Sequence, residues 1–415
     1  MATIQYALPS HWIKYKEAEI FQELTDAKAA VLVLKTIPFQ RRWVEELQKI
    51  QLKMEVYGSS RIEGADFAAN ELEAAMKAET PEQLHTRSQK QANAAMRTYR
   101  WIARITDDVP VNEQLICNVH KLIVTECDDD HCAPGAIRGD DQNVTFGNPR
   151  HRGAVGGKDC EKAFKKLAEG IQGEFKQHDL LIQALALHYH FGAIHPFLDG
   201  NGRTARVLEA LMLQRAGLKD SLFIAMSNYY YDEKRAYLES LAAVRANDND
   251  LTPFLKFGLR GIALQSSRLG RMIRDEVSRQ IFRNLMHELF TRLESTRKRV
   301  IVKRQLSLLE KLLNTQGKIE FSELVTSLKE DYKSRKAPIN AIIRDLNRLG
   351  ALGAILIERT EPKPAADGET SPRMAPVYYI SIQLDWPSRI TEAEFFAKIA
   401  AMPKSKTYGF LSPSP

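Results

Sequence analysis

The stretch HPFLDGNGRTAR, residues 195–206, decides how this chain folds and what chemistry it can support. Its two glycines, Gly200 and Gly202, permit a tight turn and a close approach of the backbone to a ligand. A helical pattern follows directly, and backbone amides at the start of a helix attract an anion. Arg203 and Arg206 are three residues apart, so they share a helix face and can bind successive phosphates through their planar guanidinium groups. The segment therefore predicts a phosphate-binding loop.

Three further side chains of this loop carry chemistry. His195 has an ordinary pKa close to neutrality, so its imidazole can be neutral and accept a proton. Asp199 is a hard oxygen ligand of the kind that Mg2+ takes alongside substrate phosphates. Asn201 adds a side-chain hydrogen-bond donor. A glycine turn that merely caps a helix would explain the two glycines, but not these three polar residues together.

The loop resembles the signature of the Fic family, His-x-Phe-x-(Asp/Glu)-Gly-Asn-Gly-Arg-x-x-Arg, and every defined position is filled. The resemblance implies a mainly α fold, with a Fic-type helical core and a β-hairpin flap. It also implies transfer of AMP from ATP to a Ser, Thr or Tyr hydroxyl of a target protein, with release of pyrophosphate. The implied roles are base for His195, core anchor for Phe197, Mg2+ ligand for Asp199, α-phosphate contacts for Gly200, Asn201 and Gly202, α/β-phosphate contact for Arg203, and γ-phosphate contact for Arg206.

A second motif lies upstream, at Ser59-Ser-Arg-Ile-Glu63-Gly64. It is similar to the inhibitory pattern (Ser/Thr)-x-x-x-Glu-(Gly/Asn) of the same family, in the class that carries it ahead of the catalytic core. The resemblance implies that Glu63 pairs with Arg206, occupies the place of the γ-phosphate and leaves ATP in an unreactive pose. In some relatives the same glutamate positions water for removal of AMP, so both reaction directions stay open. A helix-capping arrangement would produce the same letters.

The helical pattern breaks between residues 133 and 157, where the family carries its flap. Val144, Thr145 and Phe146 form a short run suited to a strand, and the resemblance implies that this flap pairs with the backbone of the target. The far end, residues 151–157, lacks the consecutive prolines common in the family, which leaves the docking of the target open.

Aromatic and histidine residues near the signature allow further interpretations. Tyr229 and Tyr230 follow the signature helix in a region that lines the nucleotide pocket of related proteins, so they are candidate adenine contacts. His188 and His190 could suggest a metal-dependent phosphohydrolase. Residues two positions apart cannot both face one site from a regular helix, however, which favours histidines satisfied within a buried central helix over residues 183–194.

Length and composition favour a multidomain enzyme. The chain has 415 residues, of which 44% are hydrophobic, enough for more than one sizeable core. The first thirty residues mix charged and apolar side chains, unlike a signal peptide, and no apolar run is long enough to span a bilayer. The four cysteines fit no standard zinc spacing. We therefore expect a soluble, cytoplasmic protein without a membrane partner.

The net charge of +7 is unevenly distributed. The stretch from Arg260 to Arg304 contains twelve Lys and Arg residues but only four Asp and Glu residues. Its apolar residues recur with a roughly helical period. Such a basic helix suits nucleic acid or an acidic partner, and it equally suits an interdomain helix with a solvated basic face. The charge alone does not choose between these two interpretations.

The C-terminal third has a different pattern. Three short amphipathic helices are followed by β-rich runs at residues 354–357 and 377–382, an order that resembles a winged helix with a two-stranded ribbon. In its third helix the apolar residues form one stripe. The polar side chains that would reach DNA bases are Asn340, Arg344, Asn347 and Arg348.

We therefore predict a mainly α chain with a winged-helix-like α+β domain at its end. The expected regions are 1–110, a helical part with an inhibitory helix at about 53–64; 111–260, the catalytic core; 261–299, a long basic helix; 300–386, the winged-helix-like domain; and 387–415, a C-terminal tail.

Two classes of function compete. The first is a protein adenylyltransferase that uses ATP and Mg2+ and is held off by Glu63, with the last domain serving target choice or a homodimer. The second is a DNA-binding regulator whose core senses nucleotide. The complete signature favours the enzyme, since a decayed catalyst has no reason to keep these residues. Relatives that move phosphate or phosphocholine keep the group transferred open, although Gly202 leaves room for an α-phosphate.

Overall fold

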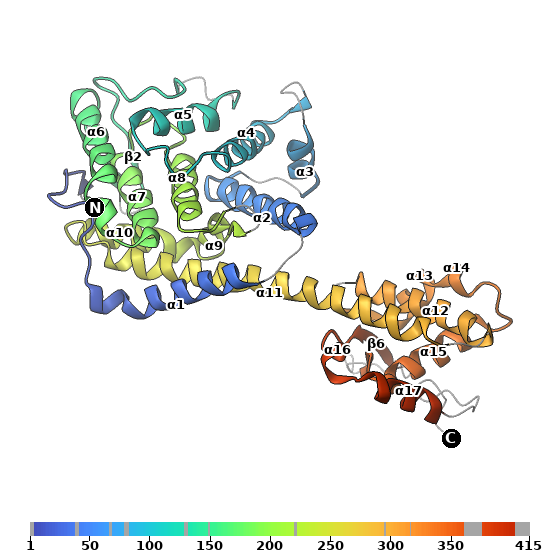
Figure 1. The fold of residues 1–415 in the computed structure, drawn as a ribbon. Coiled ribbons are helices and arrows are strands. Elements are labelled where there is room, and N and C mark those ends of the chain that lie inside the picture. Colours follow the sequence, from blue (N-terminus) through green and yellow to red (C-terminus); the bar gives the residue numbers. More distant parts are fainter. Residues whose placement is uncertain are drawn as a thin grey trace, which may run out of the picture. The chain divides into compact units, whose positions relative to one another are not determined.

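The structure is a computed structural model, and it describes residues 4–37, 41–65, 69–78, 83–127, 132–147, 150–219, 222–293, 296–315, 317–360 and 376–402. The chain forms two compact units, Met1–Arg271 and Met272–Pro415, and helix α11 (Thr252–Thr291) contributes residues to both (Figure 1). Within the described ranges, no helix is both long and apolar enough to cross a membrane.

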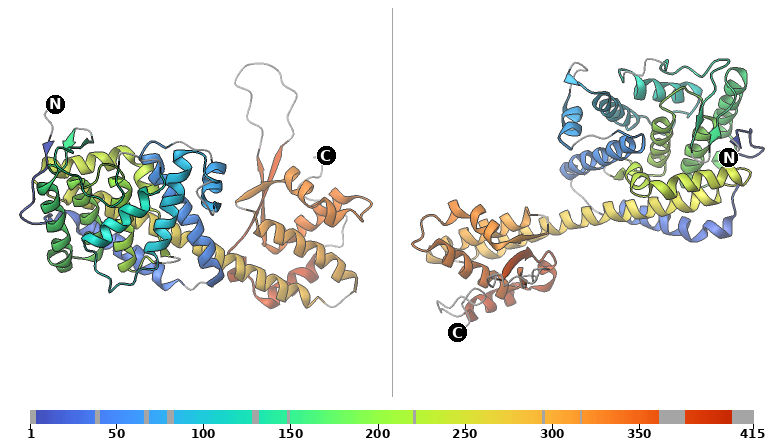
Figure 2. Two further views of the ribbon diagram at one scale, coloured as in Figure 1. Left: turned by 90° about the horizontal axis from the view of Figure 1, so that it is seen from above. Right: turned by 180° about the vertical axis from the view of Figure 1, so that it is seen from behind.

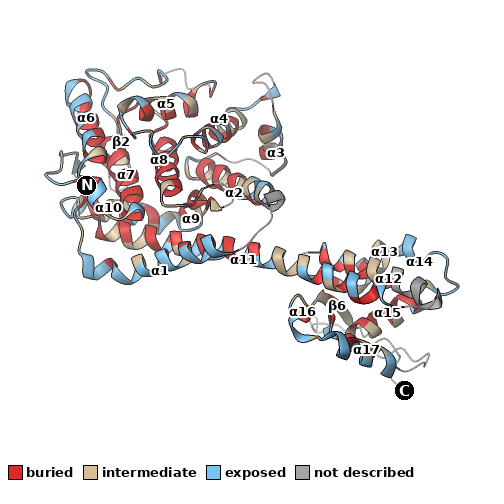
Figure 3. Cartoon of the chain, in the orientation of Figure 1, coloured by how far each residue is buried: buried red, intermediate tan, exposed pale blue. Residues whose placement is uncertain are grey.

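Two helices form the centre of the first unit, α7 (Leu180–Ile194) and α8 (Asn201–Arg215). Helix α7 is buried on all sides, which confirms the predicted central helix, because a helix that is apolar all round needs protein against every face. Helix α8 is buried from Arg203 to Gln214, even though two arginines lie in its first two turns. Figure 3 shows both helices buried along most of their length.

The remaining helices of this unit cover the central pair. Helix α2 packs on α9 and α4, α5 packs on α4 and α8, and α6 packs on α7. Local signals start several of them: Thr86 and Gln89 form a capping box before α4, and Asn112 caps α5. The bounds are α1 (Glu17–Thr36), α2 (Arg41–Ile62), α3 (Ala69–Lys77), α4 (Arg87–Ile102), α5 (Glu113–Val124), α6 (Lys158–Gln172), a 3-10 turn (Glu174–Gln177), α9 (Met226–Asp232) and α10 (Lys234–Ala246).

A small sheet lies beside the end of α7. Strands β2 (Thr145–Phe146) and β3 (His151–Arg152) form an antiparallel hairpin, as predicted for the flap, and Val144 directly precedes it. Strand β1 (Ile4–Gln5) pairs in parallel with the other edge of β3. The sheet order is thus β1-β3-β2, and a segment from the start of the chain belongs to the flap. This third strand was not expected from the sequence.

The second unit combines helices with a three-stranded antiparallel sheet of order β4-β6-β5 (Figure 2). The predicted ribbon had two strands; β4 was missed because its three residues lead directly into a helix. The bounds are α12 (Thr296–Leu313), β4 (Lys318–Glu320), α13 (Phe321–Ser327), α14 (Lys329–Tyr332), α15 (Pro338–Leu352), β5 (Ile355–Thr360), β6 (Val377–Ile382), α16 (Trp386–Arg389) and α17 (Glu392–Ala401).

The core of the second unit extends past the predicted domain end at residue 386. Helix α17 lies within the region expected as a tail, yet its Phe395 is fully buried with Trp386 in the core of this unit. The basic stretch expected as one helix over 261–299 is divided between α11 and α12. Apolar residues of α11 from Phe282 onward, together with Leu293 just past its end, join this same core, so packing rather than charge determines where the helix lies.

A buried ion pair lies inside the second unit. Asp345 interrupts the apolar face of α15 and is fully buried. The guanidinium of Arg304 donates to it at 3.1 and 3.2 Å, and the hydroxyl of Tyr332 donates at 3.1 Å. Gln305 adds a longer contact at 3.4 Å. Three side chains therefore donate hydrogen bonds to this carboxylate, and a buried charge requires such partners.

Candidate functional site

The predicted phosphate loop joins α7 to α8. His195 ends α7 with a left-handed backbone, φ +54°, and Gly200 precedes α8 with φ +75°. A side chain at Gly200 would place its Cβ 2.6 Å from Val124 Cγ1, so both the backbone angle and the packing require glycine. The loop therefore turns sharply at Gly200, and the first backbone amides of α8 follow this turn directly.

Asn201 closes this loop. Its side-chain oxygen accepts from the backbone N–H of Phe197 at 3.0 Å, and its side-chain nitrogen donates to the Phe197 carbonyl at 2.8 Å. Phe197 itself is fully buried, as expected of a core anchor. The structure thus uses the Asn201 side chain inside the loop, and what remains of Asn201 for a phosphate is its backbone.

His195 is held as a neutral imidazole with one defined tautomer. Its Nδ1 donates to the carbonyl of Gly192 at 3.1 Å, which leaves Nε2 as the proton acceptor. Burial lowers the pKa of His195 to about 4, and the positive charge of Arg138 adds to this lowering. The ring of Phe146, from the flap, stacks on the imidazole with centroids 3.9 Å apart. The expected base is therefore available at neutral pH.

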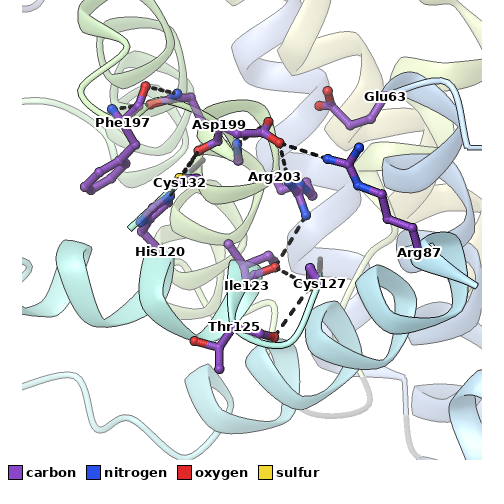
Figure 4. A network of polar contacts seen from close by, with 12 residues as sticks. Glu63, Arg87, His120, Ile123, Thr125, Cys127, Cys132, Phe197, Asp199 and Arg203 are labelled. Carbon is purple, nitrogen blue, oxygen red and sulfur yellow. Dashed lines mark hydrogen bonds and ion pairs between the residues drawn. The ribbon is translucent and has the colours of Figure 1, made fainter. Parts of the chain in front are cut away.

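Asp199 contacts two arginines through its carboxylate and a histidine through its backbone carbonyl (Figure 4). Its carboxylate contacts Arg203 on α8 at 3.5 Å and Arg87 at the start of α4 at 3.4 Å. The Nε2 of His120 lies 3.0 Å from the Asp199 carbonyl, while the Nδ1 of His120 accepts from the Gly135 amide at 2.9 Å. His120 must therefore carry its proton on Nε2 and donate to the loop.

His120 and Arg87 lie at this candidate site, and the sequence did not indicate either residue. The ring of His120 also stacks on Phe197, with centroids 3.6 Å apart, so it supports the loop through both packing and hydrogen bonding. Both residues lie far from the signature in the sequence and outside any motif. Nothing short of the fold could have indicated them.

The carboxylate of Asp199 fits a Mg2+ ion that is bound mainly through phosphates and water. The side chain is about one-third exposed, and Gly200 N–H donates to Oδ1 at 2.6 Å. Among the residues that the structure describes, no three or more His, Cys, Asp or Glu side chains gather into a metal cage. A single hard carboxylate beside a phosphate loop is what nucleotide-borne Mg2+ requires of a protein.

The predicted inhibitory motif lies directly over this loop. The guanidinium of Arg206 donates to Glu63 Oε1 at 2.6 Å and to the hydroxyl of Ser59 at 2.9 Å. A side chain at Gly202 would bring its Cβ to 2.5 Å from Glu63 Oε1, so the carboxylate lies against the first turn of α8. Gly64 follows α2 with φ +88°, which lets the chain turn away after Glu63.

Charge holds Glu63 in its ionised form. Burial acts to raise its pKa, but the charge and hydrogen bond of Arg206 lower it below the ordinary value. The same pair raises the pKa of Arg206, whose guanidinium is almost fully buried. The Glu63 side chain, in contrast, keeps 40% of its surface exposed. The carboxylate therefore enters the site from the solvent side and could leave the same way.

A buried carboxylate on α2, that of Glu55, binds this helix to its neighbours α4 and α9. Glu55 accepts from the Tyr99 hydroxyl at 2.6 Å, from the Ser227 amide at 2.8 Å and from the Ser227 hydroxyl. Burial raises its pKa. One turn later a side chain at Gly58 would place its Cβ 2.6 Å from the Ser227 and Asn228 backbone. The helix that carries Glu63 thus docks closely on α9.

The candidate adenine contacts lie in the core of the first unit. The Tyr230 ring is fully buried, stacks on Tyr237 at 4.6 Å and donates through its hydroxyl to Glu209. The Tyr229 ring is buried against Phe257 at 4.9 Å. In the structure, protein already covers both rings, so neither offers an open face for stacking.

The rival metal interpretations find no geometry among the described residues. His188 bonds to Glu209 and to the Tyr237 hydroxyl, whereas His190 bonds to the carbonyl of Trp12, so the two imidazoles diverge as predicted. The cysteines are free thiols. His131, which could have completed a site with them, lies outside the described residues.

Comparison with known proteins agrees with this geometry. Residues 110–213 match the model of the Fic/DOC family. Proteins named protein adenylyltransferase Fic from Culex quinquefasciatus and Nematostella vectensis are each 39% identical, over 84 and 83 residues. These matches cover 20% of this chain and 15% and 17% of the relatives, so the chain spans less than a fifth of their length.

Solved structures extend the likeness of fold. A Fic family protein from Desulfovibrio desulfuricans G20 has a TM-score of 0.52 at 18% identity, covering 92% of this chain and 98% of its own. Residues 134–508 of Fic-1 from C. elegans have a TM-score of 0.50 at 18% identity, covering 61% of this chain and 72% of that one. The signature loop, the fold and the family match together show a Fic domain over residues 110–213.

Proposed function

We propose that this protein transfers AMP from ATP to a hydroxyl of a target protein and that Glu63 holds the reaction off. The observation that carries the proposal is the arrangement around α8: a neutral imidazole with its Nε2 available stands ahead of the loop, and two buried guanidinium groups follow it. This combination supports the proposal of a base beside a site for a triphosphate. The named activity of the relatives supports the same reaction class.

In the proposed reaction, His195 Nε2 accepts the proton of the target Ser, Thr or Tyr hydroxyl. The oxygen then attacks the α-phosphorus, a P–O bond forms, and the bond to the pyrophosphate oxygen breaks. The hydrogen bond from Nδ1 to Gly192 keeps Nε2 unprotonated and oriented. Because the pKa of His195 is lowered to about 4, the imidazole is ready to accept a proton over the whole neutral range.

The phosphates are bound by the first two turns of α8. Backbone amides of Gly200, Asn201 and Gly202 receive the α-phosphate, where the start of the helix favours negative charge. Arg203 takes the α/β-phosphates and Arg206 takes the γ-phosphate, each through a planar fork that suits phosphate oxygens. Asp199 would hold the Mg2+ that accompanies ATP, and this ion would supply positive charge that offsets the charge of the pyrophosphate.

Inhibition follows from competition for Arg206. Glu63 satisfies the guanidinium at 2.6 Å and lies against Gly202, so the γ-phosphate and the α-phosphate cannot both be seated correctly while it is bound. When ATP enters in this state, its α-phosphorus is out of line with the attacking oxygen. The same carboxylate is suitably placed to activate water for the removal of AMP from a modified target.

Intact-mass measurement after incubation with ATP and Mg2+ tests the proposal. We expect the Glu63→Gly protein to gain the mass of one or more AMP groups on itself, and the wild-type protein to gain far less. Adding His195→Ala to Glu63→Gly should reduce the rate roughly 10²–10⁴-fold, because general-base catalysis is lost. Adding Arg206→Ala instead should abolish the gain, since the γ-phosphate contact is gone.

Several results would contradict the proposal. Equal modification of wild type and Glu63→Gly at saturating ATP would show that Glu63 does not inhibit. An increase by the mass of phosphate or phosphocholine in place of AMP would assign a different transferred group. Incubating pre-modified protein with wild type and with Glu63→Gly, and following the loss of AMP, measures the reverse activity.

A further inference from the structure

We propose that Arg138 is a positioning residue that locks the target-docking flap and the main chain of the catalytic base to each other. This inference rests on the proposed transfer reaction, for which the flap must present the target at a defined place. The residue belongs to no part of the signature or of the inhibitory motif. It lies in the segment between α5 and β2.

Arg138 is an unusual cation for a protein interior. Only 1% of its surface is exposed, and among the described residues no carboxylate forms an ion pair with it. Burying an unpaired charge is costly unless polar groups solvate it. In this structure backbone carbonyls solvate the charge, and they accept hydrogen bonds from all three nitrogens of the guanidinium group.

Two of these carbonyls belong to the end of α7. The Nε of Arg138 donates to the carbonyl of His195 at 2.8 Å, and Nη2 has a longer contact with Ile194 at 3.4 Å. The last carbonyls of a helix have no partner within the helix and carry the negative end of its dipole. Arg138 therefore caps α7 from a distant part of the chain, at the residue that we propose as the base.

The other carbonyls belong to the flap. Nη2 donates to Ala154 at 2.7 Å, and Nη1 donates to Gln142, so the fork grips the segments on both sides of the β2–β3 hairpin. The backbone continues the same link, because Arg138 N–H donates to Pro196 at 2.9 Å and Ala154 N–H donates to Ile194 at 2.9 Å.

The consequence is that the flap cannot move without moving His195. His195 has the left-handed backbone that is uncommon for a residue other than glycine, and the contact from Arg138 to its carbonyl helps to hold it there. The ring is then set between its bond to Gly192 and the flap residue Phe146. Lysine at position 138 would keep the charge but could not reach carbonyls on both sides.

Kinetics in the Glu63→Gly protein test this role. We expect Arg138→Lys to lower kcat for self-modification about 10²-fold, the scale of a misplacement of about 1 Å at a reacting centre. The dissociation constant for ATP should stay unchanged, because Arg138 is not among the groups that bind phosphate. Arg235→Gln is the matched control: it removes an arginine whose side chain is 91% exposed on α10, away from the flap, and it should leave the rate unchanged.

A second readout does not depend on catalysis. The charged and titratable groups that act on the His195 ring are Arg138, Glu63 and His151. In full-length protein labelled at histidine, NMR titration should show a small rise in the pKa of His195 in Arg138→Gln, because burial, the larger cause of the low value, remains, and no rise in Arg138→Lys. Charge and geometry are thereby separated, since the lysine variant keeps the pKa and loses the rate.

Each outcome decides something. A rate for Arg138→Lys within threefold of its parent would overturn the proposal, as would a pKa of His195 that falls in Arg138→Gln, because removal of a nearby positive charge cannot lower it. If both variants unfold, Gly153→Ala replaces them: its Cβ would lie 2.7 Å from the Ile194 carbonyl and 3.3 Å from Arg138 Nη2, and an unaltered kcat would sink the idea. If no variant transfers AMP, the proposed function fails while the NMR result still judges Arg138.

Discussion

Each unit of this protein buries an arginine beside a carboxylate, and the two pairs differ in one respect. In the second unit, Arg304 and Asp345 expose 7% and 0% of their side chains. In the first unit, Arg206 exposes 2% while its partner Glu63 exposes 40%. The enclosed pair cannot be exchanged without unpacking a core. The half-open pair can be, which is the property expected of an inhibitor that a phosphate must displace.

The largest effect should come from breaking the enclosed pair. Asp345→Ala leaves Arg304 buried without its partner, and we expect the second unit to lose roughly 3–5 kcal/mol of its free energy of unfolding. Hydrogen exchange of the α15 amides measures this loss directly. Glu330→Ala, which removes the exposed partner of Lys333, is the control and should change little. A small loss for Asp345→Ala would mean that the two pairs do not differ as their burial suggests.

The half-open pair should instead respond in activity. Glu63→Gln keeps a hydrogen-bonding side chain beside Arg206 but removes its charge, so we expect self-modification to rise on the order of tenfold, since a charged hydrogen-bond partner binds about 1 kcal/mol or more tighter than a neutral one. Thermal stability should barely move. Unchanged self-modification would show that charge is not what keeps Glu63 on Arg206.

Acid should release this pair only at low pH. The pKa of Glu63 is lowered, so the contribution of the ion pair is complete above the ordinary carboxyl value and is lost as the pH falls through the lowered value. Inhibition of the wild-type protein should therefore be constant between about pH 7.5 and 5.5, well above the ordinary carboxyl range. A rise in self-modification within that range, measured against Glu63→Gly at each pH, would contradict the lowered pKa.

A smaller release should follow from loosening α2 without touching Glu63. Gly58→Ala forces a methyl group against the Ser227 and Asn228 backbone, so α2 must lift from α9. We expect a several-fold rise in self-modification and a loss of about 1–3 kcal/mol in stability, the usual cost of overpacking. Glu46→Ala, on the exposed side of the same helix, controls for changes in α2 itself. Loss of stability with no rise in activity would separate helix docking from inhibition.

The smallest effect concerns DNA. Of the four polar residues expected to reach bases from α15, only Asn340 is fully on the surface, whereas Arg344, Asn347 and Arg348 are half-buried. We therefore expect weak binding of mixed duplex DNA by the full chain, with little change in Arg348→Ala. A salt titration of both proteins tests this, because phosphate contacts give a steep salt dependence. Tight binding that Arg348→Ala weakens would restore the DNA-binding interpretation of this domain.

Sequence alone predicted what is contiguous. The signature loop, the buried helix before it and the hairpin at Thr145 are each encoded within a few residues, as are the glycines that need unusual backbone angles. The contact between Glu63 and Arg206 spans 143 residues, and only the family resemblance, not the residues themselves, indicated it.

The supporting contacts left no such signal. His120 and Arg138 act through backbone carbonyls and amides of remote segments, which any residue type can supply, so the sequence does not mark such partners. Glu55 likewise accepts from the Ser227 amide, in addition to two hydroxyl groups. The rings of Tyr229 and Tyr230 stack on other aromatic residues of the protein in this structure, and their role as adenine contacts stays a prediction. The residue type shows that an aromatic ring is present, but it does not show which surface the ring packs against.

The strand at Ile4–Gln5 has a consequence for the order of assembly. The Gln5 side chain donates to the carbonyl of Gly153, 148 residues later in the chain. The carbonyl of Trp12 accepts from His190, 178 residues later. Closing loops of this length is entropically slow and must wait for the distant partner to be synthesised. A segment that is synthesised well before its partners is therefore among the last to find its place. In a nascent chain, β1 stays unpaired until β3 has emerged, and Trp12 lacks its contact until α7 has emerged, so the proposed docking flap is completed only together with the rest of the site.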